Sequence, residues 1–200
     1  ANPNQAEIEM DPRLLVQSEV LRREADYILE QKGVRHILKE YGEVHVTGSY
    51  DLQLMTWRDL DIYLESSCLS EETFFAIGSE LMQQLAPVRM SYRNERLAKT
   101  KGLPEGLYWG VYLNDQDKPW KIDIWGMTPV HCRELISKCD SLKRRLDEES
   151  RNCILEIKSA LCSHSHYRKS FGAYDIYLAV LDKGIRSSSE FLDYMEEARC

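Results

Sequence analysis

Three aspartates stand in segments whose residue pattern predicts β-strands. Asp59 and Asp61 alternate with leucine and isoleucine in DLDIYLE, and Asp123 stands between two isoleucines in PWKIDIWG. Side chains alternate between the two faces of a strand, so Asp59 and Asp61 should share one face while their apolar neighbours enter the core. If the strand that carries Asp123 lies beside the first, three carboxylates converge on one surface.

Carboxylates gathered in this way repel one another and take up protons unless a divalent cation neutralises them. Magnesium prefers oxygen ligands, takes few of them from the protein and completes its coordination with water and substrate phosphates. We therefore expect Asp59, Asp61 and Asp123 to be metal ligands, and magnesium to be the metal.

A Gly-Ser pair precedes the first two aspartates in the chain. Gly48 and Ser49 follow EVHVT, a β-branched segment that predicts a strand. A glycine lets the backbone approach a ligand closely, and a serine adds a hydroxyl donor. The pair is therefore a candidate phosphate-binding turn, although a simple turn after a strand has the same residues.

The order of these features resembles that of a known superfamily. A helix, a strand that ends in Gly48-Ser49, the pair Asp59 and Asp61, and Asp123 on a later strand are similar, over residues 12–126, to the nucleotidyltransferases with the DNA polymerase beta-like fold. The hairpin GLYWGVYLNDQDKPWKIDIWG also resembles that of small bacterial members, among them antibiotic nucleotidyltransferases.

The resemblance implies roles for these residues. Asp59 and Asp61 would ligate two magnesium ions, one of which accompanies the nucleotide. Asp123 would complete the site of the second ion and help to deprotonate the acceptor hydroxyl. Gly48 and Ser49 would hold the triphosphate.

Basic side chains should also contact the triphosphate, because the leaving pyrophosphate carries negative charge. The sequence does not rank the candidates, which are Arg58, Lys99, Lys101, Lys118, Lys121, Arg168 and Lys169. We assign nucleotide binding to Arg58, the neighbour of Asp59, and to Lys121, which is near Asp123. The same neighbours allow a structural alternative, in which Arg58 and Lys121 only form ion pairs with these aspartates.

The implied reaction transfers a nucleoside monophosphate from a nucleoside triphosphate to a hydroxyl of a small molecule, for example an antibiotic, or of a protein. The net charge of -7 and the pI near 5.3 provide no broad basic surface, which makes nucleic acid an unlikely partner. Two alternatives stay open: a non-catalytic nucleotide-binding or regulatory module on the same fold, and a nucleotidyltransferase that acts on RNA ends.

The expected fold class is α+β, with a mixed, mostly antiparallel sheet of about five strands flanked by helices. The last three strands, in VRMSYR, LYWGVYLN and PWKIDIWG, should form an antiparallel meander. We place the catalytic domain at residues 1–127 and a C-terminal helical region at residues 128–200, where the pattern becomes charged and helical.

The composition, 43% hydrophobic and 30% charged, is that of an ordinary globular protein. We expect a cytoplasmic protein, because the sequence contains no apolar segment long enough to span a membrane and no secretion signal. The oligomeric state is left open.

The spacing of the cysteines and histidines gives little indication of disulfides or of a metal site. The six cysteines form no CxxC pair and are expected to be reduced thiols. Cys162, His164 and His166 could bind a metal, but their spacing is more typical of a polar loop. The other histidines, His36, His45 and His131, are isolated in the sequence, so we expect ordinary structural roles for them.

Overall fold

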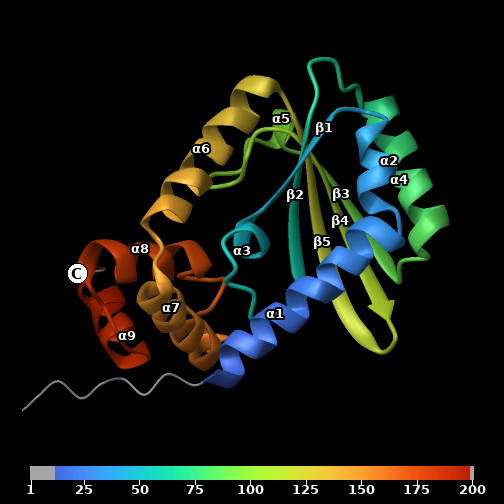
Figure 1. Cartoon of the computed structure of the whole chain (residues 1–200). Helices are drawn as coiled ribbons and strands as arrows, with labels where there is room; N and C mark the ends of the chain where they lie inside the picture. Colours follow the sequence, from blue (N-terminus) through green and yellow to red (C-terminus); the bar gives the residue numbers. More distant parts are fainter. Residues whose placement is uncertain (1–11, 199–200) are drawn as a thin grey trace, which may run out of the picture. The chain divides into compact units, whose positions relative to one another are not determined.

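The computed structural model describes residues 12–198 (Figure 1). Their contacts define two compact units. Residues 20–145 form one unit, and residues 12–19 together with 146–198 form the other. The helix after the last strand therefore groups with the sheet, whereas the sequence analysis placed it in the C-terminal helical region.

A five-stranded mixed sheet is the centre of the first unit. In the order β1-β2-β5-β4-β3, β2 and β5 are parallel and the other neighbours are antiparallel. The strands are β1 (Glu43–Thr47), β2 (Asp59–Glu65), β3 (Arg89–Asn94), β4 (Leu107–Asp115) and β5 (Lys118–Met127). The expected fold class is confirmed, including the antiparallel meander of the last three strands.

Helices cover one face of this sheet, as the view in Figure 1 shows for α2 and α4. Leu60, Ile62 and Ile122 point into this side and are fully buried. The helical segments of this layer are the end of α1 (Pro12–Asp26), a π-helix (Tyr27–Gln31), α2 (Val34–Lys39) and α4 (Glu71–Leu85). Burial of the apolar alternation thus fixes the register of β2, since a shift by one residue would move its aspartates into the core.

The opposite face of the sheet is only partly covered. Helix α6 (Pro129–Arg145) contacts β2 there, and its buried Cys132 packs with Tyr108, Trp125 and Met127. Two short helices, α3 (Gly48–Asp51) and α5 (Glu95–Ala98), follow β1 and β3 directly. The polar residues of β2 and β5 lie on this face.

Three helices make up most of the second unit: α7 (Glu148–Leu161), α8 (Ala173–Lys183) and α9 (Ser188–Glu197). Asp147 caps α7 by accepting a hydrogen bond from the amide of Ser150, and Gly184 ends α8 with a positive φ. Ile154, Ile176 and Phe191 are fully buried in the interior of this second unit. None of the helices between residues 12 and 198 combines the length and the apolar composition of a membrane span.

Candidate active site

The parallel pairing of β2 and β5 brings the three predicted carboxylates together. Asp61 lies directly opposite Asp123, and Asp59 lies opposite Lys121, two positions earlier on the same face. Asp123 is 9% exposed, while Asp59 and Asp61 are partly exposed. The structure therefore places all three aspartates on the partly open face of the sheet.

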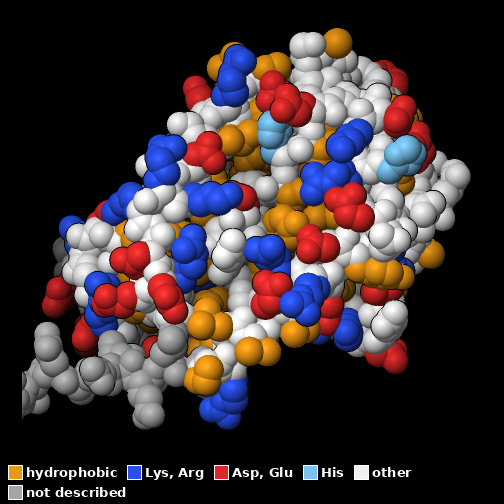
Figure 2. Space-filling model, viewed as in Figure 1, with side chains coloured by type: hydrophobic (Ala, Val, Ile, Leu, Met, Phe, Trp, Pro, Cys, Tyr) orange, Lys and Arg blue, Asp and Glu red, His pale blue; other side chains and the backbone are white. Residues whose placement is uncertain are grey.

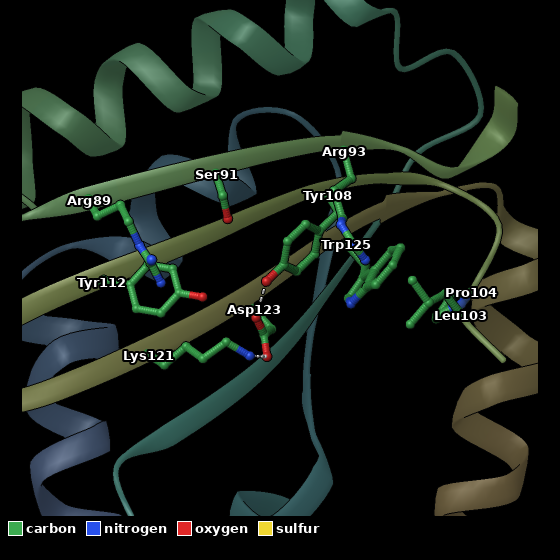
Figure 3. Close-up of a pocket in the computed structure, with 10 residues that line it drawn as sticks. All are labelled: Arg89, Ser91, Arg93, Leu103, Pro104, Tyr108, Tyr112, Lys121, Asp123 and Trp125. Carbon is green, nitrogen blue, oxygen red and sulfur yellow. Dashed lines mark hydrogen bonds and ion pairs between the residues drawn. The ribbon is translucent and has the colours of Figure 1, made fainter. Parts of the chain in front are cut away.

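Both carboxylate oxygens of Asp123 are engaged (Figure 3). The Lys121 Nζ atom lies 2.5 Å from Oδ2, and the Tyr108 hydroxyl donates to Oδ1 over 2.5 Å. Burial alone would lower the pKa of Lys121, but its hydrogen bond to Asp123 and the charges of Asp123 and Asp59 raise that pKa. Burial and then the hydrogen bond to Asp123 raise the pKa of Tyr108, so its phenol stays protonated and donates.

Gly48 lies against the carboxylate of Asp61. Its φ is +64°, and a Cβ atom added there would lie 2.3 Å from Asp61 Oδ2. Any other residue would therefore both adopt a strained backbone and collide with this carboxylate. Ser49, the other half of the predicted phosphate-binding turn, follows in the first turn of α3 and is partly exposed.

Helix α6 holds the end of this turn. Lys143 forms an ion pair with Asp51 at 2.6 Å, and the Cys139 thiol lies 3.9 Å from the other carboxylate oxygen of Asp51. Burial raises the pKa of this thiol. The position of the Gly48-Ser49 turn therefore depends on α6 as well as on β1.

Arg58 interacts with α1 instead of with the aspartates. Its Nε and Nη2 atoms donate to the two carboxylate oxygens of Glu24, and Lys118 forms a second ion pair with Glu24 at 2.6 Å. Of the two basic residues singled out from the sequence, Lys121 contacts one of the three aspartates and Arg58 is held by Glu24.

A pocket of about 580 Å³ extends from Asp123 across β4 to β3 (Figure 3). Lys121 and Asp123 stand at one side of it, and Arg89 lies over the Tyr112 ring, with its guanidinium carbon 3.8 Å from the ring centroid. The complete lining is Arg89, Ser91, Arg93, Leu103, Pro104, Tyr108, Tyr112, Lys121, Asp123 and Trp125.

The sequence analysis did not identify the two arginines of this pocket, Arg89 and Arg93, as candidate site residues. The alternation in VRMSYR places Arg89, Ser91 and Arg93 on one face of a strand, which was the available signal. The sequence did not reveal that this face continues the surface of Asp123, because that depends on the strand order. The hairpin residues Trp109, Trp120 and Trp125 are buried, and Trp125 also lines the pocket.

The donor set fits magnesium. Asp59, Asp61 and Asp123 offer only oxygen atoms, and Gly48 leaves the space beside Asp61 that a side chain would fill. Lys121 supplies positive charge to Asp123 in this structure. The Cys162, His164 and His166 tract, in contrast, does not gather into a group of potential metal ligands within residues 12–198.

Comparison with known proteins gives similarity in structure only. No protein-family model matches the sequence, and no curated protein is detectably similar to it. A structure described as the Cid1 poly(U) polymerase matches with a TM-score of 0.57 and 16% identity, over 84% of this chain and 54% of that one.

Two further solved structures match in the same way. A cytoplasmic RNA terminal U-transferase has a TM-score of 0.54 and 15% identity, over 86% of this chain and 53% of that one. The noncanonical poly(A) polymerase complex GLD-2–GLD-3 has a TM-score of 0.52 and 15% identity, over 86% and 58%. The chain spans a little more than half the length of these proteins. Its sheet, its helices and these matches show that it has the nucleotidyltransferase fold.

Proposed function

We propose that the protein is a magnesium-dependent nucleotidyltransferase, which transfers a nucleoside monophosphate from a nucleoside triphosphate to an acceptor hydroxyl. The observation that carries the proposal is the register of the parallel strands, which sets Asp61 opposite Asp123 with Asp59 on the same face. Three oxygen-donor side chains from two strands, next to a glycine turn, form a site that suits metal-bound phosphates better than it suits any uncharged ligand.

The residues of the site would have separate roles in the transfer reaction. Asp59 and Asp61 would hold magnesium, which when bound neutralises the triphosphate and lowers the pKa of an oxygen that it coordinates. The backbone of Gly48 and the hydroxyl of Ser49 bind phosphate oxygens. Asp123 orients the acceptor hydroxyl and receives or relays its proton, while the acceptor oxygen forms a bond to the α-phosphorus and the bond to pyrophosphate breaks.

Lys121 and Tyr108 hold the carboxylate of Asp123. Both donate to its carboxylate, one to each oxygen. The ammonium of Lys121 offsets part of the electrostatic repulsion between Asp123 and the two aspartates of β2. Lys121 also lines the pocket, where its ammonium would be available to a substrate phosphate.

A small molecule is the first candidate for the acceptor of the nucleoside monophosphate. The pocket beside Asp123 has a volume of about 580 Å³, within the usual range for small-molecule sites. Basic and acidic side chains are interspersed over the face shown in Figure 2. The net charge of -7 also favours a small acceptor over a long nucleic acid.

An RNA 3′ end is the second candidate acceptor, and two observations favour it. The similar structures reported above are named for the addition of nucleotides to RNA. Arg89 and Arg93 line the pocket, and arginine pairs well with phosphate.

One experiment separates these two candidates. The protein is incubated with magnesium and each labelled nucleoside triphosphate, together with hydroxyl-bearing small molecules or with RNA oligonucleotides that carry a free or a blocked 3′ hydroxyl. Transfer to one class identifies the acceptor, and Asp61→Asn serves as the inactive control. Triphosphate binding without transfer to any acceptor would favour the non-catalytic module, and neither binding nor transfer would overturn the proposal.

A further inference from the structure

His45, Glu65 and Cys132 form a cluster at the other end of the same face of the sheet. His45 is on β1, Glu65 is the last residue of β2, and Cys132 is in the first turn of α6. One nitrogen, one oxygen and one sulfur atom of these side chains lie within 4.8 Å of one another. The His45 Nε2 atom lies 3.2 Å from Glu65 Oε2.

The spacing of these atoms suits a small cation. Ligand atoms around a tetrahedral zinc ion are about 3.3 to 3.7 Å apart, given the usual bond lengths to nitrogen, oxygen and sulfur. Only small side-chain movements would bring the three atoms of the cluster to these distances. The side chains are also sheltered, with Cys132 fully buried, Glu65 17% exposed and His45 25% exposed.

A second carboxylate faces the cluster. Glu43 is directly opposite Glu65 in the antiparallel pairing of β1 and β2, and its Oε1 atom lies 3.8 Å from His45 Nε2. Like charges at directly opposed positions of a sheet are destabilising. The charge of Arg133 lowers the pKa of Cys132. A cation bound between Glu43 and Glu65 would offset the repulsion between these two carboxylates directly.

We propose that His45, Glu65 and Cys132 bind a zinc ion, with Glu43 within reach of the fourth coordination position. The donor set of imidazole, carboxylate and thiolate is one that zinc prefers, whereas magnesium takes oxygen donors. The ion links β1, β2 and the first turn of α6. It is separate from the three aspartates, because Glu65 lies about 13 Å along β2 from Asp61.

The site has a structural consequence. Its ion fixes the beginning of α6 on the sheet, and the far end of the same helix supports the Gly48-Ser49 turn through Lys143 and Asp51. Cys132 must lose its proton to bind the metal. Burial, together with the charges of Glu65 and Glu43, raises the pKa of this thiol to about 12 in the metal-free protein, so zinc has to displace that proton.

Cobalt(II) is the probe for this site. The full chain, freed of metal and kept reduced, is titrated with cobalt(II), and near-ultraviolet absorption from sulfur-to-cobalt charge transfer is recorded. We expect a band that saturates at one ion per chain and that disappears when zinc displaces the cobalt. The three aspartates cannot give this band, because they contain no sulfur.

Variants assign the band to a residue. Cys132→Ser should abolish it, whereas Cys139→Ser on the same helix and Asp61→Asn should keep it. Because Cys132 is fully buried, His45→Asn provides a second variant on a more exposed residue and should weaken cobalt binding at least about tenfold. Circular dichroism checks that each variant is folded.

Stability provides an independent measurement. Zinc should raise the melting temperature of the wild-type chain and of Asp61→Asn, should raise that of His45→Asn less, and should have no such effect on Cys132→Ser. A wild-type chain that gives no charge-transfer band, or a band that persists in Cys132→Ser, would overturn the zinc site. Neither result would bear on nucleotide transfer.

Discussion

Asp61 and Asp123 occupy directly opposed positions on the parallel strands β2 and β5, although two helices and two further strands separate them in the sequence. Both point to the partly open face of the sheet, so neither carboxylate is required for the core. We expect Asp61→Asn to lower nucleotide transfer by more than about 100-fold, because a lost metal ligand should cost more than a lost supporting residue. The melting temperature should change little.

The matched control for this change is Asp117→Asn. Asp117 is exposed in the turn between β4 and β5 and has a φ of +61°, a conformation that asparagine tolerates. Transfer rates of both variants are measured with the same triphosphate and acceptor. An Asp61→Asn enzyme as active as Asp117→Asn would show that the carboxylate has no role in the chemistry.

Gly48 allows a similar comparison. We expect Gly48→Ala to abolish transfer, because its new methyl group would fall 2.3 Å from Asp61 Oδ2 and displace either the turn or the carboxylate. Gly102 has a φ of +86° and open space around its Cβ position, so Gly102→Ala carries only the backbone cost, about 1 to 2 kcal/mol.

Transfer rates and thermal melts of the two glycine variants distinguish strain from collision. Equal losses of activity would mean that Gly48 matters only for its backbone conformation. A Gly48→Ala enzyme that loses activity while Gly102→Ala keeps it would support close contact between the turn and Asp61.

The sheet could be predicted from the sequence because its signals are local. Leu60, Ile62 and Leu64 alternate with polar residues, and each lies buried as that alternation requires. Strand pairing is not local: the position of β5 between β2 and β4 follows from how the apolar faces pack together. The sequence also did not indicate that α6 belongs to the sheet unit, because this polar helix contributes few buried residues, among them Cys132 and Leu142.

The candidate site shows the same difference between local signals, which the sequence contains, and long-range contacts, which it does not reveal. Asp59, Asp61 and Asp123 stood out because acids are unusual between core residues, and their meeting depended on one strand pairing. Arg58 had the right charge and position in the sequence, but its partner, Glu24, lies on a helix far earlier in the chain. His45 looked isolated for the same reason, because Glu65 and Cys132 approach it only in the folded chain.

The arginines of the pocket should govern the acceptor and not the nucleotide. We expect Arg89→Ala combined with Arg93→Ala to raise the KM for a phosphate-bearing acceptor by about tenfold or more, since one charge-assisted hydrogen bond contributes about 1.5 to 3 kcal/mol. The KM for the triphosphate should stay unchanged. Arg93 also forms an ion pair with Glu95 at 3.6 Å, so the two single variants are measured as well.

Steady-state kinetics with varied acceptor and with varied triphosphate check this prediction. Arg144→Ala, an exposed arginine on α6, is the charge-matched control. A double variant that changes only the KM for the triphosphate would assign the pocket to the nucleotide instead.

Glu24 gives the sheet unit a pH-dependent stability. The hydrogen bond from Arg58 lowers the pKa of Glu24 most, burial opposes that effect, and Lys118 lowers the pKa further, so the folded pKa lies below the ordinary value of 4.5. The unfolded chain therefore binds the proton more readily than the folded chain does. The stability from these ion pairs is present above about pH 4.5 and is lost as the pH falls through the folded pKa.

We therefore expect Glu24→Gln to destabilise the protein by about 1 kcal/mol near pH 7 and by less near pH 3.5. Urea unfolding followed by tryptophan fluorescence is a suitable measurement, because all four tryptophans lie within residues 20–145. Glu105→Gln, at an exposed position, should have no effect at either pH. If Glu24→Gln lowered stability equally at both pH values, its effect would come from packing, since loss of an ion pair should disappear once the wild-type carboxyl is protonated.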